Sequence, residues 1–408
     1  MIKKYFPALA HDNYRRYWIG QLISLIGTWM QRMGQAWLVY EITNSPMKLG
    51  IVGSLQFLPI LLFSLIAGVW IDRLPKKRIL YYTQFFSMVL AFALAFLVLV
   101  ERIEYYQVLI MAFLLGCANA IDMPTRQSYM IELVGKEDLS SAVALNSTIF
   151  NLARVIGPSI AGVVMASFHL GWCFFVNGLS FLAVMYSLAR IDAKSVIKEG
   201  STTSMWKEMR EGLSYIKNHP ILLQTVLTLF YTGILAFNFS VLIPIIARDI
   251  LHLREQGYGA LMSSLGLGSL LGAVILSVKL KQKIHQAPTI ITITNFVMGV
   301  MLICIGLSTN FPLTLFLLFV CGFFNLCFSI TANSLLQLTT EDRYRGRVMS
   351  VHAMVFAGTT PIGNFFTGMI SEHFGAGNAF IVSGILIMIL CLSIKYKYTK
   401  SNSVTRGR

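Results

Sequence analysis

Apolar runs of about 20 residues recur along this chain from end to end, and a helix of that length crosses a bilayer. Charged residues make up only 12% of the 408 residues, whereas a soluble domain carries about a quarter. The sequence therefore predicts an all-α integral membrane protein. Its twelve predicted spans are 17–40, 49–71, 79–100, 105–123, 141–168, 172–190, 221–247, 258–278, 289–307, 313–334, 348–370 and 378–394.

The longest polar connector divides these spans into two groups of six. The connector mixes Trp206, Leu213 and Ile216 with charged residues, which indicates an amphipathic helix at the membrane interface or a solvated linker helix. We therefore expect an N-terminal six-helix bundle, a cytoplasmic linker with an amphipathic helix, a C-terminal six-helix bundle and a basic cytoplasmic tail, at 1–190, 191–220, 221–394 and 395–408.

The basic residues predict the orientation. If the N-terminus lies inside the cell, the outer loops hold only Lys48, Arg102, Arg248 and Arg254 of the 33 Lys and Arg residues. This distribution follows the positive-inside rule and predicts a multi-pass protein with both termini cytoplasmic. The net charge of +15 resides in short loops rather than on one face, which argues against a nucleic-acid partner.

The two halves of the chain resemble each other. Asp138 and Asp342, half the chain length apart, each follow a Glu and precede a predicted helix, and the same shift carries Gly68 onto Gly272. Because six spans is an even number, both halves enter the membrane from the same side and form a parallel repeat with a central cavity. Alternating access requires such a duplication around a cavity.

The loop between the second and third predicted spans joins an acid–base pair to a cationic block. Its charged residues, after Gly68, are Asp72, Arg73, Lys76, Lys77 and Arg78. The positive-inside rule explains the cations of this loop but not its carboxylate. The sequence favours a loop whose charged groups change partners during a conformational change, and a loop that only determines orientation is the alternative.

This loop, Gly68-x-x-x-Asp72-Arg73-x-x-Lys76-Lys77-Arg78, resembles the most diagnostic motif of the major facilitator superfamily. Twelve spans in two halves extend the resemblance over essentially the whole chain. The stretches 13–15, 28–43, 119–134, 247–259 and 345–350 are similar to the bacterial exporter branch of enterobactin exporters and macrolide efflux proteins. The resemblance implies the major facilitator fold, with twelve transmembrane helices as two parallel six-helix repeats around a central cavity. It does not select a substrate, because one fold serves many cargoes.

The resemblance also implies a role for the loop. Asp72 would pack at the start of a helix of the second half, where a carboxylate is favoured by ~0.3–1 kcal/mol, and close the cytoplasmic side. Asp122 and Arg126 lie at the same predicted depth and extend this into one network between helices. The predicted cytoplasmic latch comprises Gly68, Asp72, Arg73, Lys76, Lys77, Arg78, Asp122, Arg126, Arg345 and Arg347.

Arg32 and Arg154 are the strongly ionised side chains that fall well inside predicted spans. An Arg at the centre of a span costs about 2.5–3.5 kcal/mol on insertion scales, so such residues usually face a cavity. We assign Arg32, Gln35, Asn151 and Arg154 to a substrate pathway. In the alternative interpretation, either arginine only stabilises helix packing by binding backbone carbonyls.

Gly157, Pro158 and Gly162 in the fifth span resemble, incompletely, the antiporter motif of the superfamily, whose upstream glycines are absent here. A Gly-Pro pair removes one backbone hydrogen bond and permits close helix packing, which suits a bending gate helix. The mid-span residues include no Asp or Glu. Glu41, at the outer end of the first span, is our candidate for proton coupling, and an ordinary surface charge is the alternative.

No cofactor or metal is expected, because the six cysteines lie in apolar runs without CxxC or His pairing. A phosphate-binding GxxxxGK[ST] loop and a catalytic constellation are also absent from the sequence, so we expect neither an ATP-driven pump nor an enzyme.

The sequence thus predicts a secondary active exporter of a small amphipathic molecule, either a drug or a siderophore-like metabolite, by alternating access with proton antiport. The expected partners are this substrate, protons and membrane lipid. The expected location is the bacterial inner membrane, and the expected state is a monomer. A lipid or lysolipid flippase of the same fold and a non-transporting membrane receptor are the alternatives from other classes.

Overall fold

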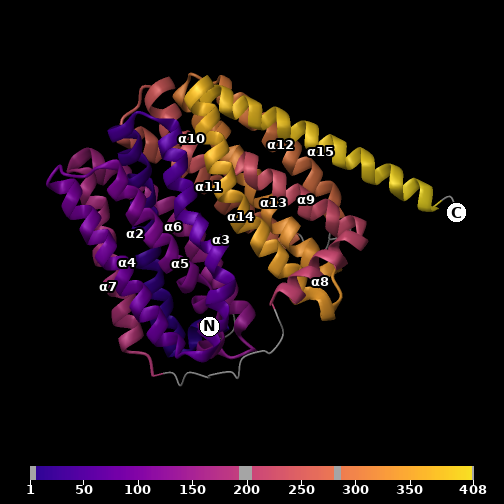
Figure 1. The fold of residues 1–408 in the computed structure, drawn as a ribbon, viewed down its shortest axis with the longest axis horizontal. Helices are drawn as coiled ribbons and strands as arrows, with labels where there is room; N and C mark the ends of the chain where they lie inside the picture. Colours follow the sequence, from indigo (N-terminus) through magenta and orange to yellow (C-terminus); the bar gives the residue numbers. More distant parts are fainter. Residues whose placement is uncertain (1–5, 193–204, 280–285, 407–408) are drawn as a thin grey trace. The chain divides into compact units, whose positions relative to one another are not determined.

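The computed structural model describes residues 6–192, 205–279 and 286–406, with the side chains of 64–73, 205–208, 277–279 and 396–406 left undescribed. In these ranges the chain is helical and contains no strand (Figure 1). The helices are η1 (Pro7–Ala10), α2 (Asp12–Thr43), α3 (Pro46–Arg73), α4 (Lys76–Leu99), α5 (Tyr105–Val134), α6 (Leu139–Ser167), α7 (Leu170–Ala189), α8 (Met205–Asn218), α9 (Pro220–Ala236), α10 (Phe239–Ile245), the π-helical turn η2 (Ile246–Ile250), α11 (Glu255–Lys279), α12 (Ala287–Leu307), α13 (Phe311–Thr339), α14 (Asp342–Phe374) and α15 (Ala376–Arg406).

Ten stretches of the described chain are long and apolar enough to cross a membrane, with α9, α10 and η2 forming one of them. The remaining two long helices are α2 and α14, of 32 and 33 residues. Polar residues such as Gln31 and Arg32 make α2 less apolar than the others. Together these twelve elements correspond to the twelve predicted spans, and the described chain is all-α, as the sequence predicts.

Several helices continue beyond the predicted ends of their spans. The fourth span was expected to end at residue 123, but α5 passes through Pro124 and continues to Val134. The predicted span 221–247 is interrupted at Phe237 and Asn238, between α9 and α10. The extension of α5 matters for the site, because it places Asp122 and Arg126 one helical turn apart on one helix.

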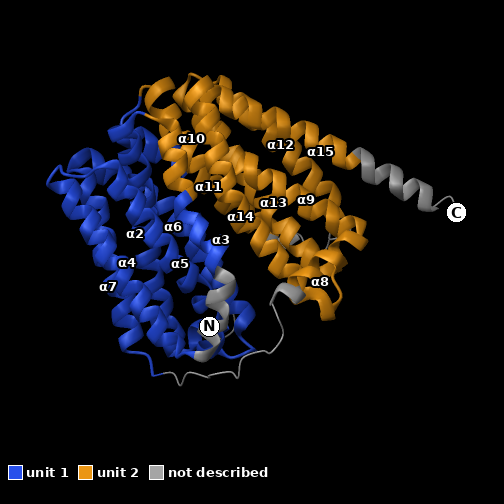
Figure 2. Cartoon of the chain, in the orientation of Figure 1, with its two compact units in different colours: residues 1–44, 55–202, 253–263 blue, residues 45–54, 203–252, 264–408 orange. Residues whose placement is uncertain are grey.

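The chain divides into two compact units (Figure 2). Unit 1 contains residues 1–44, 55–202 and 253–263, and unit 2 contains residues 45–54, 203–252 and 264–408. The first turns of α3 therefore belong to unit 2, and the first turns of α11 belong to unit 1. The domain limits expected from the sequence, 1–190, 191–220, 221–394 and 395–408, stay a prediction.

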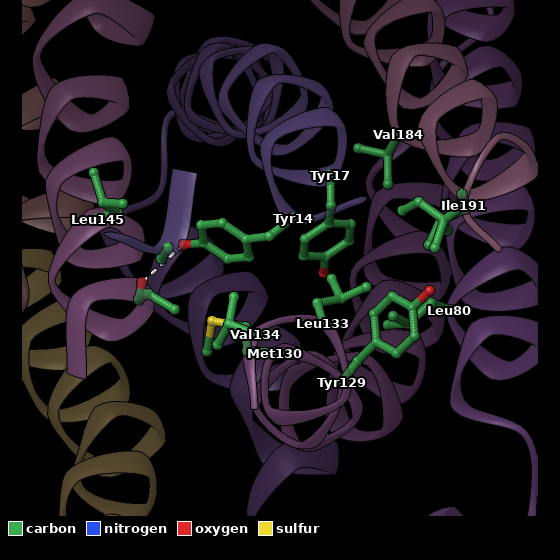
Figure 3. Close-up of a cluster of buried hydrophobic side chains, with 13 residues drawn as sticks. Tyr14, Tyr17, Leu80, Tyr129, Met130, Leu133, Val134, Leu145, Val184 and Ile191 are labelled. Atoms are coloured by element: carbon green, nitrogen blue, oxygen red, sulfur yellow. Dashed lines mark hydrogen bonds between the residues drawn. The ribbon is translucent and has the colours of Figure 1, made fainter. Parts of the chain in front are cut away.

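In unit 1, a cluster of buried side chains holds the start of α2 among α5, α6 and α7 (Figure 3). The Tyr14 hydroxyl donates a hydrogen bond of 2.9 Å to the Ala142 carbonyl in α6. The rings of Tyr17 and Tyr129 meet edge to face, with centroids 5.7 Å apart. Edge-to-face aromatic pairs add about 0.5–1.5 kcal/mol to the burial of their surface. The cluster therefore determines the position of α2.

In unit 2, α8 packs against the start of α14. Ile216 is buried in a cluster that includes Val348 of α14. A Cβ on Gly212 would lie 2.8 Å from the Arg347 carbonyl oxygen, so the two helices touch through backbone. The rings of Tyr215 and Tyr344 stack with centroids 4.4 Å apart. The linker helix α8 thus packs its apolar residue Ile216 against α14 of the same unit.

Each unit also contains a close crossing between a glycine of α3 or α11 and a glycine of another helix. In unit 1, a Cβ on Gly259 of α11 would lie 3.0 Å from the Gly162 Cα of α6. In unit 2, a Cβ on Gly50 of α3 would lie 3.0 Å from the Gly368 Cα of α14. Glycine lets helix backbones approach closely in membranes. The same packing in both units agrees with the parallel repeat of the fold.

Candidate substrate site

A polar cavity of about 180 Å³ lies inside unit 1, among α2, α3, α4, α5, α6 and α7. Three ionised groups contribute to its wall, namely Arg32, Asp122 and Arg126. Polar side chains in membrane-spanning helices usually face the bundle interior or a water-filled cavity, because lipid cannot hydrogen-bond them. The amide side chains of the wall are Gln21, Gln31, Gln56, Gln84, Asn119, Gln127, Asn146 and Asn177.

Arg32 enters this cavity from the middle of α2. Its guanidinium carbon lies 5.2 Å from the centre of the Trp29 ring and 5.8 Å from the centre of the Phe57 ring. Its Nε atom is buried and has no hydrogen-bond partner among the described residues. Aromatic faces attract the cation but do not replace a hydrogen-bond acceptor for the N–H group. Arg32 therefore has a donor available for a bound anion.

Arg154 and Arg32 both lie close to the ring of Trp29. The Arg154 guanidinium carbon lies 5.9 Å from the centre of the Trp29 ring, and Trp29 also contacts the Phe150 ring edge to face at 5.6 Å. The two mid-span arginines that the sequence singled out thus gather around one indole. Arg154 itself is not part of the cavity wall.

The other two predicted pathway residues lie apart from the cavity wall. Asn151 is buried, and its amide nitrogen donates a 2.8 Å hydrogen bond to the Ser147 carbonyl one turn earlier in α6. Gln35 is buried in α2, with 5% of its surface exposed. Their assignment to a substrate pathway stays a prediction, whereas Arg32 is the member that lines the cavity.

Asp122 is the centre of the most densely hydrogen-bonded group in the wall. One carboxylate oxygen accepts hydrogen bonds of 2.8 Å from the Thr83 hydroxyl and from the Gln84 amide of α4. The other oxygen pairs with Nε of Arg126. Only 4% of Asp122 is exposed. We had placed both residues in a cytoplasmic latch, and the structure makes them neighbours in the wall of a polar cavity.

Lys76, another predicted latch residue, forms an ion pair that sequence reasoning missed. Its ammonium lies 2.6 Å from Glu132 of α5, and the two side chains are 5% and 6% exposed. Lys77 donates a 2.7 Å hydrogen bond to the Ile191 carbonyl, and Arg78 is exposed. The carboxylate of Glu132 in the polar end of α5 could have indicated a buried ion pair. Its partner Lys76 could not be identified, because it lies 56 residues away in the sequence.

The remaining latch residues fall into two groups. Gly68, Asp72 and Arg73 lie in the part of α3 whose side chains are outside the described set. In unit 2, Arg345 lies 2.5 Å from Asp342, and Arg347 lies 2.7 Å from Glu211. The role of this set as a latch stays a prediction.

The small residues of α6 contact two other helices. A Cβ on Gly157 would lie 2.5 Å from the Trp29 Cβ, so α6 packs directly on α2 beside the cavity. Gly162 and the Pro158 carbonyl face Gly259 of α11. The gate role of Gly157, Pro158 and Gly162 stays a prediction, and their contacts place α6 between α2 and α11.

Glu41 lies at the far end of α2 from Asp12 and is exposed. It lines a second groove, of about 440 Å³, together with Glu101, His169 and Glu255. The Arg32 cavity does not include it. Its expected part in proton coupling stays a prediction.

The apolar helices of the two units define a multi-pass membrane protein. The family model of transmembrane secretion effectors matches residues 4–405, and the chain belongs to this family. This membership confirms the superfamily that the loop motif indicated.

Two curated relatives match over almost their whole length. The chain is 25% identical over 388 residues to the staphyloferrin A transporter of Staphylococcus aureus, covering 94% of this chain and 95% of that protein. It is 24% identical over 384 residues to macrolide efflux protein A of Streptococcus pyogenes, covering 92% and 93%. These relatives confirm the likeness to bacterial exporters that the sequence motifs indicated.

Among solved structures, a bacterial homologue of the human lysosomal transporter Spinster, in an inward-facing and unoccupied conformation, matches with a TM-score of 0.74. The match covers 95% of this chain and 97% of that chain at 11% sequence identity. At this identity the likeness shows the shared fold.

Proposed function

We propose that this protein is a secondary active exporter that moves a small amphipathic molecule across the bacterial inner membrane by alternating access, in exchange for protons. The observation that carries the proposal is Arg32, a cation in the wall of a polar cavity with a buried N–H that lacks an acceptor. A substrate oxygen that accepted this hydrogen bond would satisfy the donor. Similarity to the staphyloferrin A transporter and to macrolide efflux protein A supports export of a small molecule.

The chemistry of the cavity favours cargo with anionic oxygens. Guanidinium groups form charge-assisted hydrogen bonds with carboxylates, and these bonds are about twice as strong as neutral ones. The amide side chains around Arg32 offer both donors and acceptors to the hydroxyl or carbonyl groups of such a molecule. A carboxylate-bearing, siderophore-like metabolite therefore fits this wall better than a cationic drug.

Proton coupling is assigned first to Asp122, with Glu41 as the second candidate. Asp122 and Arg126 form an ion pair in the cavity wall. When a hydroxyl or amide group of the cargo donates a hydrogen bond to the ionised Asp122 carboxylate, a proton cannot occupy the same oxygen. Binding of a proton by Asp122 removes this acceptor and releases the cargo group. Cargo and proton thereby compete for one carboxylate, as an antiporter requires.

The experiment is proton flux in proteoliposomes that contain the full-length protein, a pH-sensitive dye and an imposed pH gradient. The cargo panel contains a citrate-based siderophore, a macrolide and a neutral sugar. We expect flux with the siderophore in the wild type and none in Arg32→Gln, with Arg102→Gln as an exposed-charge control. Absence of cargo-dependent flux for the whole panel would overturn the antiport.

The same vesicles separate the proposal from the flippase alternative. Fluorescent phospholipids placed in one leaflet report lipid movement when an external reductant bleaches the outer leaflet. We expect the protein to leave their distribution unchanged. Lipid movement without siderophore flux favours the flippase, and neither activity together with tight cargo binding favours a receptor. Protease accessibility of tagged ends tests the proposed cytoplasmic location of both termini, and light scattering tests the monomer.

A further inference from the structure

A groove of about 380 Å³ runs between α2 and α7 of unit 1, separate from the Arg32 cavity. It lies where α2 begins and α7 ends, and its wall includes one arginine from each helix. The wall includes Arg16, Ile19, Gly20 and Ile23 of α2, and Tyr186, Ser187 and Arg190 at the end of α7.

Arg16 and Arg190 form a cationic pair at the mouth of this groove. Nη1 of Arg16 donates a 3.1 Å hydrogen bond to the Arg190 carbonyl, and the Arg190 guanidinium carbon lies 5.4 Å from the centre of the Tyr186 ring. Both arginines are exposed, and in the described part of the chain neither forms an ion pair with a carboxylate. The two arginines thus line one groove without a neutralising carboxylate from the described part of the protein.

The floor of the groove is made of small residues. A Cβ on Gly20 would lie 2.8 Å from the Ser187 hydroxyl oxygen and 2.9 Å from the Ala183 carbonyl oxygen. Because these residues are small, the two helices approach closely and no large side chain fills the groove between them. The floor is therefore shallow and continuous along the helix pair.

The sides of the groove are apolar and exposed. Ile19, Ile23 and Tyr186 expose 49%, 45% and 63% of their surfaces. α7 is among the helices apolar enough to cross a membrane, and α2 belongs to the same bundle. Exposed apolar side chains on such helices face lipid tails, since water would leave them unfavourably hydrated. The groove thus joins an acyl-chain environment to a pair of cations.

We propose that this groove binds an anionic phospholipid, with its phosphate between Arg16 and Arg190 and one acyl chain along the floor beside Ile23. Guanidinium groups match phosphate geometry through paired hydrogen bonds, and basic pockets between transmembrane helices bind anionic head groups. Lys77, which donates to the Ile191 carbonyl, adds a third cation near the end of α7. The bound lipid stabilises the contact between α2 and α7, independently of the exporter function proposed above.

The test uses native mass spectrometry of the full-length protein in neutral detergent. Phosphatidylglycerol, phosphatidylcholine and inorganic phosphate are titrated separately. We expect retention of one phosphatidylglycerol in preference to phosphatidylcholine. The Arg16→Gln/Arg190→Gln variant loses phosphatidylglycerol affinity by about tenfold or more, because it removes charge-assisted hydrogen bonds. The Arg102→Gln/Lys136→Gln variant removes the same charge from exposed positions and retains wild-type affinity.

Two further measurements keep the outcome informative if the double Gln variant fails to fold. Arg16→Lys/Arg190→Lys retains the charge and keeps the preference for phosphatidylglycerol. Ile23→Trp fills the groove and lowers phosphatidylglycerol affinity while both arginines remain. An unchanged affinity in the Gln variant, or equal retention of phosphatidylcholine, overturns the proposal. Equal thermal stabilisation by inorganic phosphate and by short-chain phosphatidylglycerol would assign the arginines to a free anion and also overturn it.

Discussion

The ammonium of Lys76 lies 2.6 Å from Glu132, and this pair joins the first turn of α4 to the last turns of α5. The second carboxylate oxygen of Glu132 is buried without a hydrogen-bond partner in the described part of the protein. The pair therefore carries two charges out of water at the end of the bundle. Loss of the ammonium leaves the buried Glu132 carboxylate without its cation, whereas loss of both charges does not.

Lys76→Met is expected to lower the thermal unfolding temperature markedly. It leaves the buried Glu132 carboxylate without its cation, and removal of one partner of a buried pair costs about 3–5 kcal/mol. Lys76→Met/Glu132→Leu replaces both charges and recovers at least half of the loss. Lys136→Met, at an exposed position in the turn after α5, serves as the control. Unfolding is followed in detergent, and equal midpoints for Lys76→Met and Lys136→Met would contradict the prediction.

Arg32→Gln is expected to weaken the binding of a carboxylate cargo by about tenfold or more, since a hydrogen bond to a charged group contributes about 1.5–3 kcal/mol. Arg32→Lys keeps the charge but not the planar donor set, so it recovers part of the affinity. Binding is measured by isothermal titration calorimetry. The effect on a neutral cargo is smaller, and an equal loss for both cargoes would show that the variant perturbs the fold instead.

Asp122→Asn is expected to abolish cargo-driven proton flux while cargo binding persists. The amide retains the size of the carboxylate and still accepts a hydrogen bond from Thr83, but it carries no titrating proton. Glu41→Gln is the matched comparison and keeps the flux if Asp122 is the coupling group. The reverse result, with flux lost only in Glu41→Gln, assigns coupling to the groove at the other end of α2.

Gly157→Ala is expected to destabilise the protein by about 1–3 kcal/mol, because overpacking forces helices apart. The new methyl group would lie 2.5 Å from the Trp29 Cβ and 3.0 Å from the Ile26 carbonyl oxygen. Movement of Trp29 also disturbs the ring shared by Arg32 and Arg154, so cargo affinity falls as well. Thermal unfolding and calorimetry on one preparation measure both effects.

Gly346→Ala is the control for that substitution, since nothing lies within 4 Å of its Cβ position. Ala is preferred over Gly inside a helix by about 0.5–1 kcal/mol, so this variant is neutral or slightly stabilised. A similar loss of stability in both variants would show that overpacking against Trp29 is not its cause and would contradict the prediction.

The twelve spans could be predicted because a bilayer imposes a minimum apolar length on every helix that crosses it. Asp122 and Arg126 were predicted to share one charged network, but their contact within a single helix could not be, because the fourth predicted span ends at residue 123. In α5 the helix continues through Pro124, and the spacing of four residues becomes a contact. Prolines are tolerated in membrane helices because neighbouring groups satisfy the freed backbone.

Contacts between residues far apart in the sequence could not be predicted either. Glu132 meets Lys76 only because α4 and α5 are adjacent in the fold, and no local pattern encodes that contact. The close contact of Gly50 with Gly368 in unit 2 could have been predicted more easily. Gly363 and Gly368 follow Pro361 in α14, about half the chain length after Pro158 and Gly162 of α6. A comparison of the two halves at this position would have identified them.

The chain crosses between its two units at the first turns of α3 and α11, and this has a consequence for biogenesis. A ribosome that has delivered residues 1–192 to the membrane has not yet synthesised 253–263, the segment whose Gly259 packs on Gly162 of α6. Unit 1 therefore remains incomplete until part of the second half of the chain has been inserted. Chaperones and proteases of the membrane would therefore encounter unit 1 without residues 253–263 before the complete unit forms. A truncated gene that ends in the linker would produce only this incomplete unit.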